Sequence, residues 1–213
     1  MSTIINENLY QFSTYLKQID LSFHQYLLLT DEPLLIHTGN VIQAEFMLPK
    51  LKDALGSREL KYIFVSHFEA DECGGLPVVL SQFPKAKVIC SEVTARQLNG
   101  FGIKAEILIK KPGEKLSTDD YELEFFEYPS EMHLWNGLLV MENRRGIFFS
   151  SDLMVSFGEE IGSAKESDWH TEINNIRLEQ VPDSERLKKL QQTLLNLNPS
   201  FVATGHGICL KIK

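Results

Sequence analysis

Hydrophobic and polar positions predict strands and helices that follow one another through the first half of the chain. Residues 25–30 and 33–38 are short apolar runs separated by Asp31, Glu32 and Pro33, which predicts two strands joined by a turn. Residues 43–55 instead place apolar side chains at roughly helical spacing and end before a glycine, a favourable helix C-cap. We expect four further elements in this half: strand 60–66, helix 76–83, strand 86–91 and helix 92–98.

The second half of the chain is richer in predicted strands. Apolar, β-branched and aromatic runs bounded by Gly, Pro or Asp predict strands at 105–110, 121–128, 137–142 and 146–151. Residues 184–197 place four leucines on one helical face, with Ser184 as the expected N-cap. Residues 200–205 predict a short strand that runs into Gly-His-Gly. This order predicts one α/β (α+β) domain, residues 1–213, built from layers of sheets and helices.

Composition and charge exclude several classes of function. The chain is 43% hydrophobic and carries a net charge of −8, which argues against disorder and against binding to nucleic acid or an anionic membrane surface. No apolar run approaches the ~20 residues of a membrane-spanning helix, and the N-terminus does not resemble a signal peptide. The three cysteines form no C-x-x-C pair. We therefore expect a cytoplasmic protein without disulfides.

Candidate metal ligands are concentrated directly after the predicted strand 60–66. His67, Glu69 and Asp71 occupy alternate positions there, and Glu72 follows. In an extended backbone the alternate positions face the same side, so these side chains are expected to converge on one point or on two neighbouring points. Taken alone, this pattern is equally typical of a solvated acidic loop.

Three further candidate ligands stand at other strand ends, and this favours a metal site. His133 follows the strand-like segment 121–132, Asp152 follows 146–151, and His206 follows 200–205 between two glycines. Four strand ends that each deliver a histidine or a carboxylate are hard to attribute to chance.

These residues together carry a resemblance to a known family. The pattern H-x-E-x-D-x-x-G, a later histidine, an aspartate and Gly-His-Gly resembles the metallo-β-lactamase superfamily. Glu69 in the second ligand position resembles the flavodiiron proteins and their stand-alone relatives, the oxygen-binding diiron proteins, whereas hydrolases of the superfamily have a histidine there. The resemblance implies a four-layer αβ/βα sandwich with two metals in a groove at one edge.

The resemblance also assigns roles to the candidate ligands. It implies that His67, Glu69 and His133 bind one metal, that Asp71 and His206 bind the other, and that Asp152 bridges them. The family has a histidine where this chain has Glu72, so Glu72 either ligates through a carboxylate oxygen or leaves its place to water.

The donor set bears on which metal binds. Three imidazoles and four carboxylates favour iron or manganese more than the nitrogen-rich sites that zinc prefers, although zinc can occupy such a site. Four anionic ligands also stabilise a higher oxidation state. We therefore expect two iron ions, with zinc or manganese as substitutes, and O₂ or NO as the small ligand.

The expected function is that of a stand-alone non-haem diiron protein that binds O₂ or NO, as a sensor or as a reductase. Flavodiiron proteins carry a flavodoxin domain after the metal domain, and this sequence ends at Lys213. The resemblance therefore implies no FMN in this chain and an external electron donor or a signalling partner. It also implies a homodimer. In flavodiiron proteins the dimer brings the flavin of one subunit to the metals of the other, and that reason for dimerising does not apply here. The alternative is a dinuclear hydrolase that acts on an ester, thioester or phosphoester. A third reading is an interaction domain with a vestigial site.

Three other residues are candidates for a supporting role at the expected site. His24 is a candidate for supporting the ligands from behind, although a hydrogen-bonded structural histidine is the more common case, and the same holds for His37. Cys73 follows Asp71 by two positions and could tune the site, but such a cysteine is more often buried filler.

Overall fold

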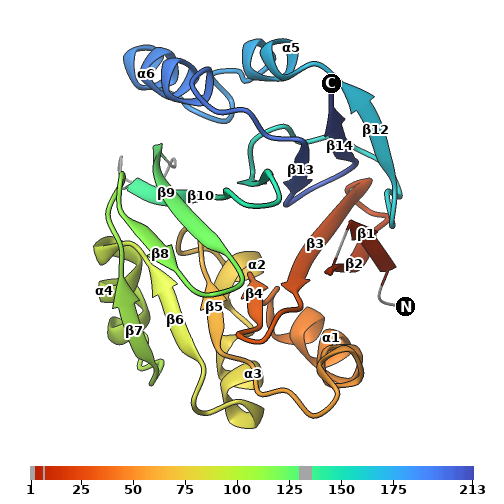
Figure 1. Cartoon of the computed structure of the whole chain (residues 1–213), viewed down its shortest axis with the longest axis vertical. Helices are drawn as coiled ribbons and strands as arrows, with labels where there is room; N and C mark the ends of the chain where they lie inside the picture. The colour runs from red at the N-terminus through yellow and green to blue at the C-terminus, as the bar shows by residue number, and fades with distance from the viewer. Residues whose placement is uncertain (1–2, 7, 130–135) are drawn as a thin grey trace.

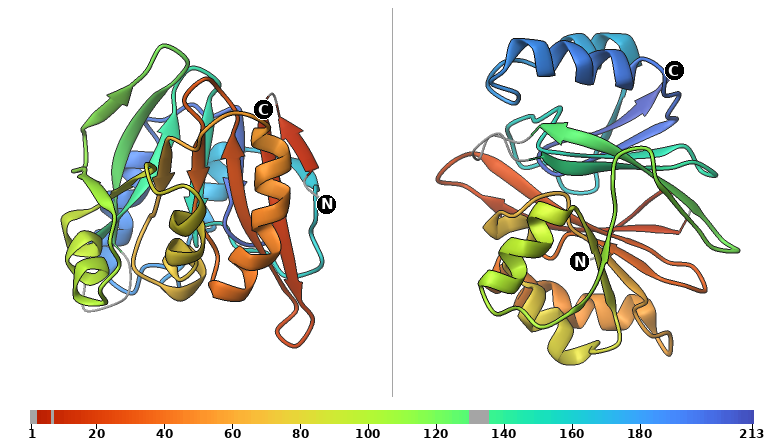
Figure 2. Two further views of the ribbon diagram at one scale, coloured as in Figure 1. Left: turned by 90° about the horizontal axis from the view of Figure 1, so that it is seen from below. Right: turned by 90° about the vertical axis from the view of Figure 1, so that its left-hand side faces the viewer.

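The computed structural model describes residues 3–6, 8–129 and 136–213. Two seven-stranded sheets pack face to face, and helices cover the outer face of each sheet (Figures 1 and 2). The predicted four-layer αβ/βα sandwich is therefore confirmed. The second view in Figure 2 shows the helix–sheet–sheet–helix order edge-on.

The first sheet has the strand order β1-β2-β3-β4-β5-β6-β7. The pairs from β1 to β4 are antiparallel, and those from β4 to β7 are parallel. Parallel neighbours need crossover connections, and these supply the helices on the outer face. The strands are β1 (Thr3–Asn6), β2 (Leu9–Leu16), β3 (Leu21–Leu28), β4 (Leu34–Ile36), β5 (Tyr62–Phe64), β6 (Lys87–Cys90) and β7 (Glu106–Ile109). The helices are α1 (Val41–Leu55), the short α2 (Ala70–Cys73), α3 (Leu76–Gln82) and α4 (Glu92–Gly100).

The second sheet has the order β12-β14-β13-β11-β10-β9-β8. The β11–β13 and β12–β14 pairs are parallel, and the remaining pairs are antiparallel. Two helices, α5 (Trp169–Asn174) and α6 (Ser184–Leu194), cover its outer face. The strands are β8 (Lys115–Ser117), β9 (Glu122–Pro129), β10 (Asn136–Glu142), β11 (Ile147–Ser151), β12 (Ala164–Ser167), β13 (Phe201–Thr204) and β14 (Cys209–Ile212).

Three hydrophobic layers hold the sandwich together, because the central strands are buried on both faces. In β3, Leu27 packs toward the helices of the first sheet, while Leu28 packs between the sheets. In β11, Phe149 packs between the sheets and Phe148 packs toward α5 and α6. Strands buried on both faces read as continuous apolar runs, which explains why the central strands are the predicted ones.

Several elements of weaker sequence pattern were not predicted. They are β1, β2, β8, β12, β14, α2 and α5. Most contain few buried apolar side chains and depend on pairing with a neighbouring strand. Residues 158–172 contain β12 and the start of α5, where Trp169 is buried and its Nε1 donates to the Leu194 carbonyl at 2.9 Å.

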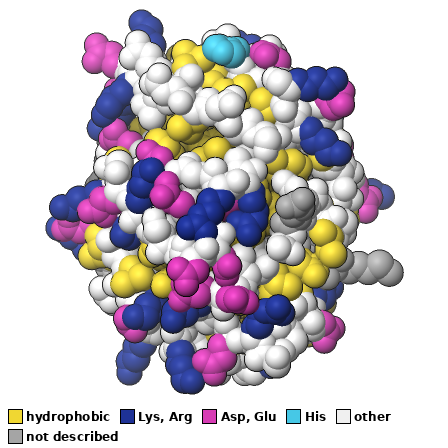
Figure 3. All heavy atoms as spheres, in the orientation of Figure 1, with side chains coloured by type: hydrophobic (Ala, Val, Ile, Leu, Met, Phe, Trp, Pro, Cys, Tyr) yellow, Lys and Arg dark blue, Asp and Glu magenta, His cyan; other side chains and the backbone are white. Residues whose placement is uncertain are grey.

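The described surface gives no sign of a membrane span. Among residues 3–6, 8–129 and 136–213, no helix is both long enough and apolar enough to cross a bilayer. On the face seen in Figure 3, basic and acidic side chains are interspersed.

Helix ends follow the capping rules, with one correction to the prediction. Gly56 caps α1 at a φ of 59°, as expected. Asp183, and not Ser184, is the N-cap of α6, because its Oδ1 accepts hydrogen bonds from the backbone nitrogens of Glu185 and Arg186. Both residue types can cap a helix, and the entry angle of the chain decides which one does.

We expect Asp183→Ala to lower the free energy of unfolding by about 1 kcal/mol, since two backbone donors lose their acceptor. Ser184→Ala, the matched control one position along, should change it by less than about 0.5 kcal/mol. Chemical denaturation of both variants measures the difference. Equal losses in the two variants would contradict the assignment of the cap.

Candidate metal centre

The candidate site lies where strand ends of both sheets meet. His67 and Glu69 follow β5 of the first sheet, while Asp152 follows β11 and His206 follows β13 of the second sheet. Loops at strand ends can carry polar groups without burying unpaired backbone inside the sheets. The site is thus built on loops that two rigid sheets hold in register.

Backbone contacts between the sheets hold these loops close together. The Leu138 nitrogen of β10 donates to the Ser66 carbonyl at 2.8 Å, and the His24 nitrogen of β3 donates to the Gly205 carbonyl at 2.9 Å. Gly137 permits the first approach, since a Cβ there would lie 2.5 Å from the Ser66 carbonyl oxygen. Within the second sheet, Gly205 permits the end of β13 to lie close to β11, because its Cβ would lie 2.7 Å from the Ser151 carbonyl oxygen.

The backbone around the H-x-E-x-D motif is not extended, which corrects the sequence prediction. Glu69 has extended torsion angles, but it is the N-cap position of α2, and Asp71 and Glu72 already belong to that helix. The Cys73 nitrogen donates to the Glu69 carbonyl at 3.0 Å and closes the turn. His67, Glu69 and Asp71 therefore point to two neighbouring places instead of forming one row.

Asp152 lies between two imidazoles. Its Oδ2 is 3.1 Å from Nε2 of His67, and its Oδ1 is 3.1 Å from Nε2 of His206. On the His67 side, Glu69 Oε1 lies 3.7 Å from the same Nε2. On the His206 side, Asp71 Oδ2 lies 3.5 Å from the imidazole. The carboxylate of Asp152 thus divides the site into two ligand groups and belongs to both.

The two 3.1 Å distances between Asp152 and the imidazoles fit the edges of a metal coordination shell. Two ligand atoms that each lie about 2.1 Å from one small divalent ion are roughly 3.0–3.4 Å apart at ordinary coordination angles. Two groups of ligand atoms, all within 4.8 Å of one another, are His67 with Glu69 and Asp152, and Glu72 with Asp152 and His206. The arrangement suits two ions that share one carboxylate.

Glu72, a member of the second group, is buried. Its Oε1 accepts a hydrogen bond from the Ser151 hydroxyl at 3.1 Å. Its Oε2 lies 2.5 Å from Nδ1 of His37 but, among the described residues, accepts no hydrogen bond of good geometry. A buried carboxylate oxygen with unused acceptor capacity fits a place beside a cation.

The charges of the site influence one another strongly. Burial raises the pKa of Asp71, and the negative charge of Glu72 raises it further. Burial also opposes ionisation of Asp152, but hydrogen bonds from His206 and His67 outweigh it and hold the pKa of that carboxyl well below its usual range. The pKa of His67 is raised despite its burial, because Asp152 and Glu69 face it. Carboxylates crowded in this way are compensated by positive charge, either from protons on the imidazoles or from metal ions.

Three of the predicted site residues need separate comment. His133 lies outside the described residues, so its role as a ligand stays a prediction. The Nε2 of His24 donates to the Gly207 carbonyl at 2.8 Å, and its Nδ1 lies 2.7 Å from the Ser13 hydroxyl. It therefore braces the loop that carries His206. The Cys73 thiol donates to the Glu69 carbonyl at 3.1 Å, and burial raises its pKa to about 12.

Three functional neighbours were not singled out from the sequence as parts of the site. His37 was interpreted as structural, and Ser66 and Ser151 were not considered. Each contacts a candidate ligand in the structure. The only sequence signal of the two serines is that each stands next to a candidate ligand, since Ser66 precedes His67 and Ser151 precedes Asp152.

Known proteins resemble this chain in sequence and in fold. A family model described as "ODP family beta lactamase" matches residues 21–207. The chain belongs to this ODP family. An annotated relative, a nitric oxide reductase of Moorella thermoacetica, is 25% identical over 199 residues, which cover 88% of this chain and 49% of the relative. The chain thus spans about half the length of that curated protein.

Solved structures of flavodiiron proteins share the fold of this ODP-family chain. The rubredoxin oxygen:oxidoreductase of Desulfovibrio gigas matches with a TM-score of 0.80 and 18% identity, over 99% of this chain and 57% of the other. The metal-soaked flavodiiron core of Flv1 from Synechocystis matches with a TM-score of 0.81 and 19% identity, over the same shares of the two chains. These structures confirm the flavodiiron-like metallo-β-lactamase fold that the ligand pattern suggested.

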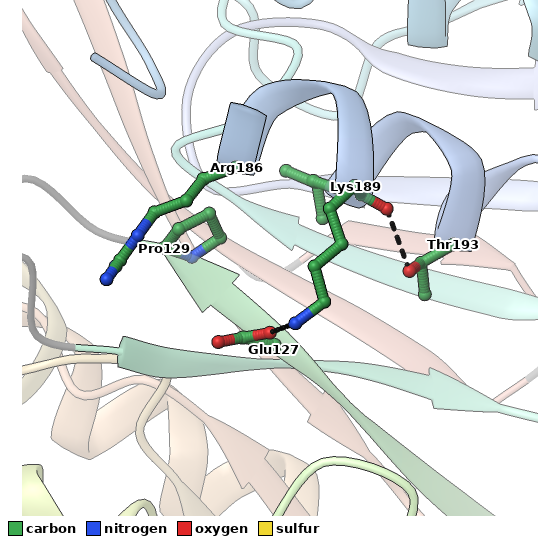
Figure 4. Close-up of a pocket in the computed structure, with 6 residues that line it drawn as sticks. Glu127, Pro129, Arg186, Lys189 and Thr193 are labelled. Atoms are coloured by element: carbon green, nitrogen blue, oxygen red, sulfur yellow. Dashed lines mark hydrogen bonds and ion pairs between the residues drawn. The ribbon is translucent and has the colours of Figure 1, made fainter. Parts of the chain in front are cut away.

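The described residues that line a pocket elsewhere on the second sheet include none of the candidate ligands. The pocket lies between β9 and α6 and is lined in part by Glu127, Pro129 and Arg186 (Figure 4). Lys189 Nζ lies 2.6 Å from Glu127 Oε2 across it. This pocket therefore gives no reason to place the chemistry away from the strand ends.

We expect Asp152→Asn to weaken metal binding at both positions by more than about 10-fold, because each oxygen of Asp152 faces a different imidazole. Glu69 lies on the His67 side only, so Glu69→Gln should weaken metal binding at the position beside His67 and not at the one beside His206. Titration of the metal-free protein with Zn²⁺, followed by metal analysis, measures both effects. Loss of a single ion in Asp152→Asn would contradict its shared position.

We expect His24 to make the metal-free protein sensitive to mild acid. Burial lowers the pKa of His24 from 6.5 to about 4, so the unfolded state binds more protons in this window. The free energy of unfolding should fall by up to about 3 kcal/mol as the pH decreases from 6.5 to 4.

The control for this effect is His24→Gln, which keeps a donor for the Gly207 carbonyl and does not titrate. Denaturant unfolding of both proteins over this pH range isolates the contribution of His24, because the other histidines titrate in both. Parallel pH curves would show that His24 is not buried as a neutral imidazole.

Proposed function

We propose that this protein is a non-haem diiron protein that binds O₂ or NO between the two ligand groups and reduces it when electrons are supplied. The observation that carries the proposal is the Asp152 carboxylate, whose two oxygens face His67 and His206. Membership of the ODP family supports it, as do the names of the matched proteins, a nitric oxide reductase and an oxygen:oxidoreductase.

The donor types support iron over zinc. Glu69, Asp71, Glu72 and Asp152 supply four carboxylates beside the imidazoles, and their four negative charges offset those of two divalent cations. Imidazole and carboxylate together suit iron that changes valence, and an iron pair supplies the electrons that O₂ or NO accepts. Manganese and zinc fit the same donors as substitutes.

The protein residues bind and orient in this proposal. His67 and Glu69, with His133 by the family pattern, hold one ion, while Asp71 and His206 hold the second and Asp152 is shared. His24 fixes the loop of His206 through the Gly207 carbonyl. Burial of the imidazoles and of Glu72 limits water around the ions, which strengthens the electrostatic interactions among them.

The electron supply is part of the proposal as well. The relatives are about twice as long as this chain, so their complete activities carry over to it only as a hypothesis. We propose that reducing equivalents come from a separate donor. An assay therefore supplies a chemical reductant.

We expect protein loaded anaerobically with Fe²⁺ to bind two iron ions and to develop a visible charge-transfer absorption band on exposure to O₂. With excess reductant it should consume O₂ or NO catalytically. Asp152→Asn, prepared in the same way, should show neither the band nor the consumption.

A fully iron-loaded protein that stays colourless with O₂ and inert toward NO would contradict the proposal. Hydrolysis of generic ester or phosphodiester substrates by the zinc-loaded protein, without reactivity toward either gas, would establish the hydrolase alternative instead. Glu69 in place of a histidine is the sequence feature that speaks against that alternative.

A further inference from the structure

A continuous line of buried polar side chains runs behind the candidate ligands. Nδ1 of His67 lies 2.8 Å from the Ser66 hydroxyl, which lies 2.8 Å from the Ser151 hydroxyl. Ser151 donates to Glu72 Oε1 at 3.1 Å, and Glu72 Oε2 lies 2.5 Å from Nδ1 of His37. All five side chains are at most 4% exposed. This buried chain connects a ligand of one metal position to a carboxylate at the other.

The hydrogen bonds of the buried chain have one consistent direction. An ionised Glu72 can only accept, so the Ser151 hydroxyl donates to it and accepts from Ser66. Ser66 in turn accepts from Nδ1 of His67. The proton on Nδ1 leaves Nε2 of His67 as the ligating nitrogen, on the side that faces Asp152 and Glu69.

Two members of the buried chain occupy strained backbone conformations. His37 has a φ of 60° and Ser151 a φ of 48°, in the left-handed region that residues other than glycine rarely adopt. Such conformations are unfavourable for residues other than glycine and persist where the surroundings enforce them. The His37 ring is further held by stacking on Phe64, with ring centroids 6.1 Å apart. The fold therefore accepts strain at two places that both contact Glu72.

Glu72 is the position where this chain departs from the family pattern of its ligands. A carboxylate there has free rotation about its side-chain bonds unless partners fix both oxygens. The Ser151 hydroxyl donates a hydrogen bond to Oε1, and the imidazole of His37 lies against Oε2, with Nδ1 2.5 Å away as an ion-pair contact. Partners of this kind orient metal ligands and determine how tightly the metal binds.

We propose that His37, Ser151 and Ser66 are positioning residues that hold Glu72 as a fixed carboxylate ligand at the second metal position and join it to His67 at the first. The inference rests on the proposed dinuclear centre but not on its reaction with O₂ or NO. It makes Glu72 a substitute for the family histidine and assigns its support to residues outside the ligand motif.

The test measures Co²⁺ binding to the metal-free full chain, by equilibrium titration and by the visible absorption spectrum of the bound ion. Wild type should bind two Co²⁺ ions. Ser151→Ala and His37→Gly should weaken the ion held by Glu72 by about 10- to 100-fold and change its spectrum. Ser66→Ala should weaken the ion held by His67.

Matched variants separate positioning from a general loss of packing. His37→Asn tolerates the left-handed backbone and keeps a donor nitrogen near the place of Nδ1, so it should restore affinity and spectrum to near wild type, whereas His37→Gly tolerates the backbone without the donor. Ser91→Ala removes a buried hydroxyl whose hydrogen bonds go to Thr94 of α4 and not to the buried chain, so it should leave both ions unchanged. Glu72→Gln, which has the same shape, should reproduce the loss seen in Ser151→Ala.

Three results would overturn the proposal. Wild-type affinity and spectrum at both positions in Ser151→Ala and His37→Gly would show that Glu72 needs no support. An equal loss in His37→Asn and His37→Gly would show that the ring acts by packing alone. Unchanged Co²⁺ binding in Glu72→Gln would remove Glu72 from the ligands. A protein that binds Co²⁺ as expected and yet ignores O₂ and NO when loaded with iron would leave this inference standing while contradicting the proposed function.

Discussion

The two contacts of Asp152 are the constraint on which the site depends. One carboxylate can face His67 and His206 at equal distance only if β5 of one sheet ends where β11 and β13 of the other sheet end. Close packing of the sheets enforces this coincidence, since their shared apolar layer leaves little freedom to slide. The hydrophobic core thus determines the separation of the polar groups at its edge.

The electrostatics of the site follow from the same packing. Carboxylates and imidazoles buried together are unfavourable unless their charges cancel, and protons or metal ions can both do so. The raised pKa of His67 and the lowered pKa of Asp152 describe neutralisation by protons, in which imidazolium ions face a carboxylate. The distances among the same atoms also suit neutralisation by metal ions. Protons therefore neutralise these carboxylates in the metal-free protein, and cations can take the place of the protons.

The Glu72 carboxylate shows how residues outside the ligand motif contact a candidate ligand. A histidine would ligate with one nitrogen, whereas a carboxylate has two oxygens to be held. In this chain the second group of ligands combines His206 with several carboxylates, while the first contains His67 and Glu69. The two groups of candidate ligands therefore differ in charge, and Glu72 is contacted by His37 from the β4–α1 connection and by Ser151 of β11.

The sequence by itself determined the central strands, most of the longer helices, the layered fold class and the candidate ligands. Continuous apolar runs and ligand residues at strand ends are local signals, which a chain displays before it folds. Only the tertiary structure decided that Asp183 and not Ser184 caps α6, that Asp71 lies in a helical turn, and that weakly apolar segments such as β12 become strands. It alone also brought His37 and Ser151 to Glu72, because the first contact arises from the pairing of β4 with β5 and the second from the packing of the two sheets, and neither leaves a periodic trace along the chain.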